Sequence, residues 1–239
     1  MYEKQKYLLL KDLTEEDGLL NYLTKNHAVI CGGAVRAVFA GEYISDYDIY
    51  FKCYKDLVEF EKTSALDDFI KLATTETADT YVKDHLKIQI IHISELMLPN
   101  PLDIITHFDY TICMGAFDLD SMEFILHNKF LEHVAGRELC YNIYGKYPLS
   151  SLFRLRKYLK KGYTISGTEI IKLGLSINAL QMKTYHDLKA QLQGIDTLFL
   201  KELTDTLLKP EYAEKEYDFD TFMNLIDSYF GSKLDDFLE

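Results

Sequence analysis

The sequence predicts an α+β protein, with a mixed sheet and flanking helices followed by a small helical domain. Three observations predict this class. Between residues 28 and 51 the chain reads as a strand, a Gly-Gly turn, a helix and a second strand. Two further pairs of strand-like segments meet at short polar turns, at residues 83–85 and 118–121. From Ser150 onward the segments are helical, so we expect one domain over residues 1–147 and a helical domain over residues 148–239.

The first strand, turn and helix form a unit that suits an anionic ligand. Four apolar residues, 28–31, predict a short buried strand before Gly32 and Gly33. Residues 34–40 predict one or two helical turns, which end at Gly41, a residue type common at helix C-caps. Glycines at a strand-to-helix turn let the backbone approach a ligand and point N–H groups and the helix N-terminus at it. This arrangement favours a phosphate.

Two carboxylates follow on the predicted second strand, residues 46–51. Because side chains alternate along a strand, Asp46 and Asp48 share one face of it. Acidic residues are disfavoured in strands, and two on one face repel each other, so a purely structural role explains them poorly. Next to a phosphate-binding turn they predict a divalent-metal site for phosphoryl transfer. We expect this site at one edge of the sheet, facing a cleft between the two domains.

The remaining elements are predicted from caps, spacing and turn residues. Thr14 is expected to cap a helix that runs to about Asn26, and another helix is expected over residues 55–72. Paired strands are expected over 74–82 and 86–93, a short helix from Pro101, and strands over 110–117 and 122–126. Breaks between the later helices are expected at Gly162, Gly167, Gly194, Pro210 and Gly231.

The spacing between the glycines and the aspartates resembles a motif of the nucleotidyltransferase superfamily, found in the head domain of CCA-adding enzymes and poly(A) polymerases. That motif reads G-G-x-V-R-D-x-x-x-G-x-x-x-x-D-x-D. Seven positions match it at the same spacing, namely Gly32, Gly33, Val35, Arg36, Gly41, Asp46 and Asp48. Ala37 stands where the family usually has an acid.

Two later segments resemble the same family less closely, so the resemblance covers roughly residues 25–165. Residues 107–114, HFDYTICM, are similar to the family block R-R-D-F-T-I-N-A, and Asp109 keeps its acid. Residues 148–163 are similar to the helix that follows the family's palm domain, where the family places arginines. Arg154 and Arg156 lie in this helix.

The resemblance implies a nucleotidyltransferase-like fold and a metal-dependent reaction: a nucleoside monophosphate passes from an NTP to a hydroxyl, and pyrophosphate is released. Asp46 and Asp48 would be the catalytic residues and the ligands of two Mg²⁺ ions, or of Mn²⁺. The nucleotide-binding residues would be Gly32, Gly33, Arg36, Asp109, Arg154 and Arg156. The expected partner is an NTP substrate. The acceptor stays open between a short RNA 3′ end, a protein and a small molecule, and the oligomeric state is open too.

Departures from the motif keep a second hypothesis open. The strand beside the aspartates reads KIQII, and Gln89 occupies the position where many nucleotidyltransferases carry a third carboxylate. Ala37 and the loss of both arginines before Asp109 point the same way. The alternative is a catalytically degenerate member of the fold that acts as a binding, antitoxin-like or virion-associated structural partner.

Charge bears on the partners. The formal net charge is −12, which disfavours a broad nucleic-acid track. Basic residues cluster once, at Arg154, Arg156, Lys157, Lys160 and Lys161. This stripe has two interpretations: a solvated helix face, or a contact to nucleotide or RNA phosphates.

Composition bears on the location. No apolar run reaches the eighteen residues that a membrane-spanning helix needs, and the N-terminus lacks the shape of a signal peptide. We therefore expect a cytoplasmic protein without a membrane partner, and the length fits a compact phage-type member, in the host cytoplasm or a virion. The cysteines form no C-x-x-C pair, so we expect reduced thiols, with Cys31, Cys53 and Cys113 buried.

Overall fold

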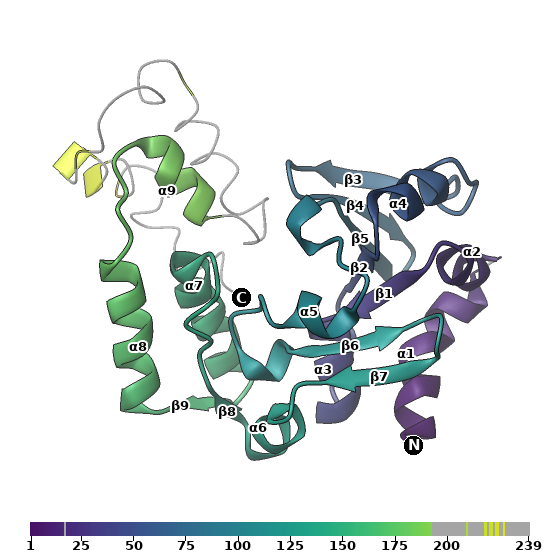
Figure 1. The fold of residues 1–239 in the computed structure, drawn as a ribbon, viewed down its shortest axis with the longest axis horizontal. Coiled ribbons are helices and arrows are strands. Elements are labelled where there is room, and N and C mark those ends of the chain that lie inside the picture. The colour runs from purple at the N-terminus through teal and green to yellow at the C-terminus, as the bar shows by residue number, and fades with distance from the viewer. Residues whose placement is uncertain are drawn as a thin grey trace. The chain divides into compact units, whose positions relative to one another are not determined.

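The computed structural model describes residues 1–16 and 18–192, together with residues 209, 218, 220, 221, 223, 224 and 227. The chain divides into two compact units, Met1–Tyr144 and Gly145–Glu239 (Figure 1). The breaks expected at Gly194, Pro210 and Gly231 lie outside the described residues.

The first unit is built on a seven-stranded mixed sheet (Figure 1). Its strands lie in the order β3-β4-β5-β2-β1-β6-β7, in which β2 and β5 run parallel and the other neighbours run antiparallel. The predicted α+β class with a mixed sheet is confirmed. The strands are β1 Ala28–Cys31, β2 Tyr47–Phe51, β3 Ile70–Thr74, β4 Ala78–Lys83, β5 Leu86–Ile91, β6 Gly115–Asp118 and β7 Glu123–Leu126.

One face of this sheet packs against helices from the first third of the chain. The Tyr47 hydroxyl of β2 donates to Asp12 of α1 at 3.4 Å, and the Phe51 ring lies 5.2 Å from the Phe60 ring of α4. Helix α3 packs against α1 on the same face. These contacts bury the odd-numbered residues of β2 and turn the even-numbered ones to the opposite face. The helices are α1 Glu3–Glu15, α2 Leu19–Lys25, α3 Gly33–Ala40 and α4 Tyr54–Glu61.

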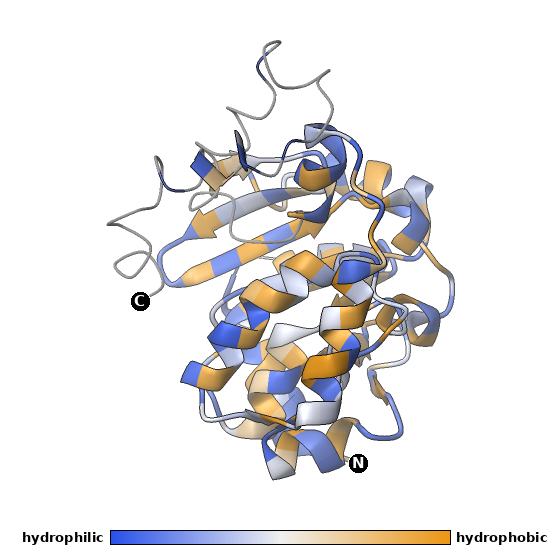
Figure 2. Ribbon diagram, turned by 90° about the vertical axis from the view of Figure 1, so that its left-hand side faces the viewer, coloured by the Kyte–Doolittle hydropathy of each residue, from blue (hydrophilic) through white to orange (hydrophobic). Residues whose placement is uncertain are grey.

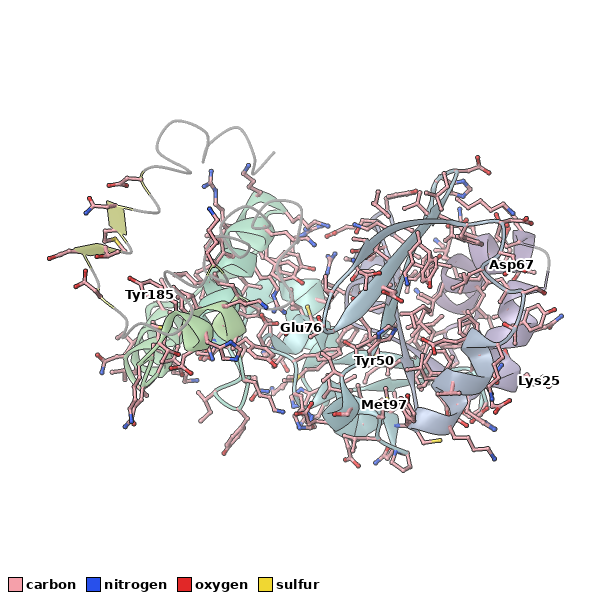
Figure 3. All side chains as sticks on the ribbon, turned by 90° about the horizontal axis from the view of Figure 1, so that it is seen from above. Lys25, Tyr50, Asp67, Glu76, Met97 and Tyr185 are labelled. Carbon is pink, nitrogen blue, oxygen red and sulfur yellow. The ribbon has the colours of Figure 1, made fainter. Side chains whose placement is uncertain are left out.

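The opposite face is covered only in part. Helix α5, Pro101–Ile105, packs beside β6 and β7, and its Ile104 and Ile105 join a buried apolar cluster with Tyr50 of β2. Figure 3 shows Tyr50 toward the middle of the first unit and Lys25 at its rim. The sheet face is therefore apolar and buried at Tyr50, whereas Asp48 and Gln89 on the same face are partly exposed. Two 3₁₀ turns, η1 Ser94–Leu96 and η2 Thr111–Cys113, and the segments α6 Phe130–Gly136 and β8 Glu138–Leu139 complete the unit.

The position of the site within the sheet differs from the prediction. Strands β1 and β2 are central, with β5 and β6 on their outer sides, so the glycines and carboxylates do not lie on an edge strand. They lie at one end of two central strands, because β1 and β2 are antiparallel and Cys31 pairs with Asp48. The end of β1 thereby meets the start of β2.

Several predicted elements are confirmed with small shifts. The buried strand before Gly32, the helix that ends at Gly41, and the strand pair around residues 83–85 are all present. Gly41 has the left-handed backbone, φ +68°, that its predicted C-cap role requires. The Asn100 side chain accepts a hydrogen bond from the Leu102 N–H at 3.1 Å, which caps the predicted helix that begins at Pro101.

Two helix predictions are wrong. Thr14 lies near the end of α1, where its hydroxyl donates to the Leu10 carbonyl, so it caps no new helix. The expected helix over residues 55–72 ends at Glu61, and β3 takes residues 70–74. Leu66, Phe69 and Ile70 suggested a continued helical face, but Ile70 begins an exposed edge strand that pairs with β4.

Two further expectations need correction. The strand expected over residues 110–117 begins only at Gly115, because residues 111–113 form the turn η2. Cys53 is exposed, since β2 ends at Phe51 and Cys53 precedes α4, whereas Cys31 and Cys113 are buried as expected. All four cysteines are free thiols.

The described part of the second unit is mainly helical. It contains α7 Pro148–Lys160, the short strand β9 Thr164–Ile165, α8 Gly167–Asn178 and α9 Tyr185–Gln191. The predicted break at Gly162 is confirmed, because this residue follows α7 with φ +80°. Gly167 instead starts α8, after the cap residue Ser166. Figure 2, viewed from the side of α8, shows apolar residues among polar ones on the helices that face the viewer, and Ile170, Ile171 and Leu175 of α8 are exposed.

Candidate nucleotide and metal site

Gly32 turns the chain from β1 into α3 with a backbone that other residues rarely adopt. Its φ is +72° and its ψ is −120°. A Cβ built on it would lie 3.5 Å from Cε2 of Phe108 and 3.7 Å from Oδ2 of Asp48. The space in front of Gly33 is open, since a Cβ there would meet no atom within 4 Å. The turn is thus a shallow cradle beside a carboxylate, and a side chain at Gly32 would fill it.

The N–H groups at this turn have distinct roles. The Gly32 N–H donates to the Gly115 carbonyl at 2.9 Å, so it holds the turn onto β6 and is not the phosphate donor that we expected. The first N–H groups inside α3 have no acceptor within a helix, as at any helix N-terminus. Gly33 begins this helix, so it and the next residues supply the anion-binding end.

The two aspartates lie directly beside the turn. Asp48 pairs in register with Cys31, the residue before Gly32, and Asp46 lies one residue before the start of β2. Both side chains are partly exposed, whereas Tyr47 between them is 2% exposed and anchors β2 to α1. The Ser45 hydroxyl donates to Oδ1 of Asp46 at 2.6 Å.

Burial and the charge of Asp48 together set the protonation of the thiol beside the turn. Burial raises the pKa of the Cys31 thiol, and the neighbouring carboxylate of Asp48 raises it further. A fully buried neutral thiol therefore forms the floor beside the carboxylate. Burial and the carboxylate of Asp12 likewise raise the pKa of Tyr47, so β2 carries an un-ionised phenol on its helix-covered face.

These residues fit a divalent cation that arrives with a nucleotide. Mg²⁺ is usually bound by one or two carboxylates together with substrate phosphates, and the turn offers two carboxylates next to an anion-binding helix end. The described residues do include a group of three metal-capable side chains within 4.8 Å of one another, Asp12, Glu15 and His85. That group joins α1 to the turn between β4 and β5, and exposed acids often cluster without a metal.

Gln89 occupies the position that the sequence indicated. It pairs with Asp48 across the parallel strands β2 and β5, so the two side chains share one face of the sheet. Thr80 of β4 pairs with Gln89 on the same face. The third position beside the aspartates is therefore neutral.

Arg36 contacts the loop that leads to Asp46. Arg36 is 3% exposed, and its guanidinium donates a hydrogen bond to Glu42 at 2.6 Å. Arg137 also reaches Glu42, at 3.5 Å. Glu42 opens the loop that leads from Gly41 to Asp46, so these contacts fix the loop that carries the first aspartate.

Asp109 is buried, and the residue before it, Phe108, contacts the Gly-Gly turn. Asp109 is 5% exposed, and its carbonyl accepts from the Asn142 N–H at 2.7 Å. The Asn142 side chain donates to the Phe108 carbonyl at 2.9 Å. The Phe108 ring then lies against Gly32 and 5.9 Å from the Tyr50 ring. Sequence reasoning had singled out Asp109 but not Phe108.

Gly115 is a second residue that sequence reasoning missed. A Cβ there would lie 2.8 Å from atoms of Val35 and Phe130, and its carbonyl holds the Gly32 N–H. A glycine inside a strand often marks such a close approach, which was the available signal.

The basic stripe belongs to the second unit. Arg154 and Arg156 are partly exposed on α7, and Lys157 and Lys160 on the same helix are exposed. The structure thus brings together Gly32, Gly33, Asp46 and Asp48 within the first unit, while the two arginines lie on a separate unit.

The fold and the turn define the class of this protein as one with the nucleotidyltransferase fold. A CCA-adding enzyme solved in complex with ATP shares the fold with a TM-score of 0.58 at 14% identity, over 93% of this chain and 69% of that chain. The Thermotoga maritima CCA-adding enzyme, solved with tRNA, has a TM-score of 0.53 at 15% identity, over 84% of this chain and 53% of that chain. The resemblance inferred from the motif is confirmed at the level of the fold.

The chain belongs to the Gabija anti-defense 2 family, whose family description matches residues 1–137. A curated relative, Gabija anti-defense 2 of Bacillus phage SPbetaL7, is 35% identical over 234 residues. The match covers 96% of this chain and 56% of the relative, so the chain spans little more than half the length of that relative. In the described part of the chain, no helix has the length and apolar character that crossing a membrane requires.

Proposed function

We propose that this protein is a divalent-metal-dependent nucleotidyltransferase that acts against Gabija defense. The NTP would lie with its triphosphate at the Gly32–Gly33 turn, and its nucleoside monophosphate would pass to a hydroxyl acceptor. The observation that carries this proposal is the placement of Asp48 against Gly32 at the N-terminus of α3. The Gly-Gly turn and the D-x-D pair come from different strands, and they meet where the end of β1 lies beside the start of β2.

The reaction divides among the residues as follows. The acceptor oxygen would attack the α-phosphorus, the bond from that phosphorus to the bridging oxygen of the β-phosphate would break, and pyrophosphate would leave. Asp46 and Asp48 would hold Mg²⁺ or Mn²⁺. The bound ions, two by resemblance, would lower the pKa of the acceptor hydroxyl and neutralise the departing charge. The first turn of α3 would stabilise the pyrophosphate, and Gly32 would let it approach the backbone.

The other predicted site residues would have supporting roles. Arg36 would position the 42–46 loop through Glu42 rather than contact phosphate. Asp109 would hold the segment that places Phe108 against the turn. Arg154 and Arg156 of α7 would bind the nucleotide or the acceptor.

The direct test is the double variant Asp46→Asn with Asp48→Asn. We expect pyrophosphate release, measured across the four NTPs with Mg²⁺ or Mn²⁺ and a pool of RNA, protein and metabolite acceptors, to fall on the order of a hundredfold or more. The matched control is Asp67→Asn with Asp68→Asn, which removes the same charge from two exposed residues outside the site. Absence of any nucleotide-dependent product from the unaltered protein would overturn the catalytic proposal.

A second candidate function is binding without catalysis. Gln89 opposite Asp48 favours it, because the site lacks a third carboxylate. The test uses Bacillus cells that carry Gabija and a phage that Gabija restricts. If the Asp46→Asn, Asp48→Asn protein protects the phage as well as the unaltered protein does, protection works by binding. If protection is lost while the folded protein accumulates normally, the nucleotidyltransferase activity is required.

A further inference from the structure

The side of Asp48 away from the Gly-Gly turn carries a polar strip that the proposed function leaves unassigned. Gln89 of β5 pairs with Asp48, and Thr80 of β4 pairs with Gln89. Lys87 lies two residues before Gln89, so its side chain is on the same face, at the level of Asp46. We call Thr80, Lys87 and Gln89 the β5 strip. All three are partly exposed.

Apolar residues continue this surface toward the sheet edge. Val82 pairs with Lys87, and Ile70 pairs with Val82, so both lie on the same face as the strip. Ile70 is 73% exposed. The assignment of faces is consistent with the opposite side, where Lys71 is 2.7 Å from Asp79 and lies over the Tyr81 ring.

The in-line geometry of phosphoryl transfer indicates a role for this surface. In phosphoryl transfer the attacking and leaving oxygens lie roughly in line, on opposite sides of the phosphorus. The anion-binding turn lies on the β1 side of Asp48, so pyrophosphate would leave there. The acceptor would then enter from the other side, which is the β5 strip.

The chemistry of the strip indicates what it takes. Lys87 makes no ion pair with any other residue in the described part of the chain, although the protein carries 38 acidic residues and a net charge of −12. Its ammonium is thus available to an anion. Gln89 and Thr80 bring neutral donors and acceptors suited to hydroxyls, and Ile70 and Val82 offer an apolar surface for a flat ring.

We propose that the β5 strip is the acceptor site, and that it takes the terminal nucleotide of an oligonucleotide, with Lys87 contacting its phosphate. This inference rests on the proposed function. A nucleotide supplies in one unit the three groups that the surface matches: a ribose hydroxyl, a phosphate and a base. The neutral residue at position 89 is then a requirement, because a carboxylate there would neutralise Lys87 and repel the phosphate.

The test measures binding by calorimetry, with a non-hydrolysable NTP analogue and Mg²⁺ already bound. The probes are a dinucleoside monophosphate, which carries one phosphate, and the corresponding nucleoside, which carries none. We expect Lys87→Ala to weaken dinucleotide binding about tenfold. The same variant should change the affinities for the nucleoside and for the NTP analogue by no more than about twofold. Lys87→Arg should retain most of the affinity for the dinucleotide.

A second variant and a control complete the test. Gln89→Glu should weaken dinucleotide binding as Lys87→Ala does, since it places a negative charge beside the lysine. Lys62→Ala removes the same charge from the exposed C-cap residue of α4, on the other face, and should leave all three affinities unchanged. The failures are distinguishable: if the unaltered protein does not bind the NTP analogue, the proposed function fails. If it binds the analogue but Lys87→Ala leaves dinucleotide affinity unchanged, or a hydroxyl-bearing peptide binds in place of the dinucleotide, the acceptor assignment is overturned.

Discussion

Gly32 combines two requirements that only glycine meets. Its backbone lies at φ +72°, which costs other residues about 1–3 kcal/mol, and its missing Cβ leaves the space beside Asp48 open. The Gly32 N–H is bound to Gly115, so the residue acts through its shape and not as a donor.

This reasoning predicts that Gly32→Ala loses nucleotide binding beyond its loss of stability. The matched control is Gly41→Ala, which places a Cβ at a similar φ of +68° but at the C-cap of α3, where nothing lies within 4 Å. We expect Gly41→Ala to cost about 1–2 kcal/mol of unfolding free energy and to retain NTP affinity. Denaturant unfolding and calorimetric titration of an NTP with Mg²⁺ measure the two effects. Equal NTP affinity in both variants would contradict a role for Gly32 at the phosphates.

At the residue scale, the sequence predicted the positions that a local motif defines. Gly32, Asp46 and Asp48 could be found because their spacing along the chain fixes their meeting across β1 and β2. Phe108 and Gly115 could not be found in this way, since they reach the turn from β6 and the segment before it, more than 70 residues further along the chain. Arg36 was found, but its partner Glu42 was not, because a buried ion pair leaves no spacing signal.

The central strands are also tied together at the end away from the site. Lys52, which follows β2, lies 2.8 Å from Asp118 at the end of β6 and 2.6 Å from Asp120 in the next turn. His27, which precedes β1, lies 2.9 Å from Asp120. Burial raises the pKa of Asp120, but hydrogen bonds from Lys52 and His27 outweigh it, so the pKa lies below its ordinary value of 3.8. One ionic cluster thus fastens three strands.

We expect Lys52→Met to destabilise the protein by about 2 kcal/mol, less than the roughly 3–5 kcal/mol of a fully buried pair, because the cluster is partly exposed. A carboxyl with a lowered folded-state pKa stabilises the fold above its ordinary pKa and loses that contribution as the pH falls. The unaltered protein should therefore lose this stability as the pH falls below 3.8, and Lys52→Met should lose less over the same range. Denaturant unfolding at a series of pH values measures both. Lys62→Met, at the exposed pair that this C-cap residue makes with Glu59 of α4, should be nearly neutral. A Lys52→Met protein as stable as the unaltered one would refute the stabilising role of the ionic cluster.

At the element scale, helices and strands were predicted correctly where cap and turn residues mark their ends. The prediction failed where tertiary contacts determine whether a segment is a helix or a strand. Asn100, Gly41 and the 83–85 turn mark their elements locally. Ile70 follows Leu66 and Phe69 at helical spacing, and only pairing with β4 makes residues 70–74 a strand. Thr14 has the composition of an N-cap, but α1 continues through it because the apolar residues Leu9, Leu10 and Leu13 bury that helix.

At the scale of the whole molecule, charge separates two surfaces. The first unit carries the acidic D-x-D site, and the described part of the second unit carries the basic stripe of α7, a helix whose own sequence, PLSSLFRLRKYLK, contains no acid. The motif predicted the first unit because its residues are close in sequence. The stripe lies in a segment that resembles the family less closely, so its role rests mainly on its charge.

The stripe predicts a salt-dependent affinity for a single-stranded oligonucleotide. Three to five phosphate contacts would give a log–log slope of about −2 to −3.5, by the rule of roughly −0.7 per contact on single strands. Changing Lys157, Lys160 and Lys161 to Ala should flatten this slope and weaken all sequences about equally, while NTP affinity stays nearly intact. The control triple, Lys4, Lys62 and Lys129 to Ala, removes the same charge from exposed residues of the first unit and should leave the slope unchanged. Fluorescence anisotropy over a series of salt concentrations measures the slope, and a salt-independent affinity would assign the stripe to a solvated helix face instead.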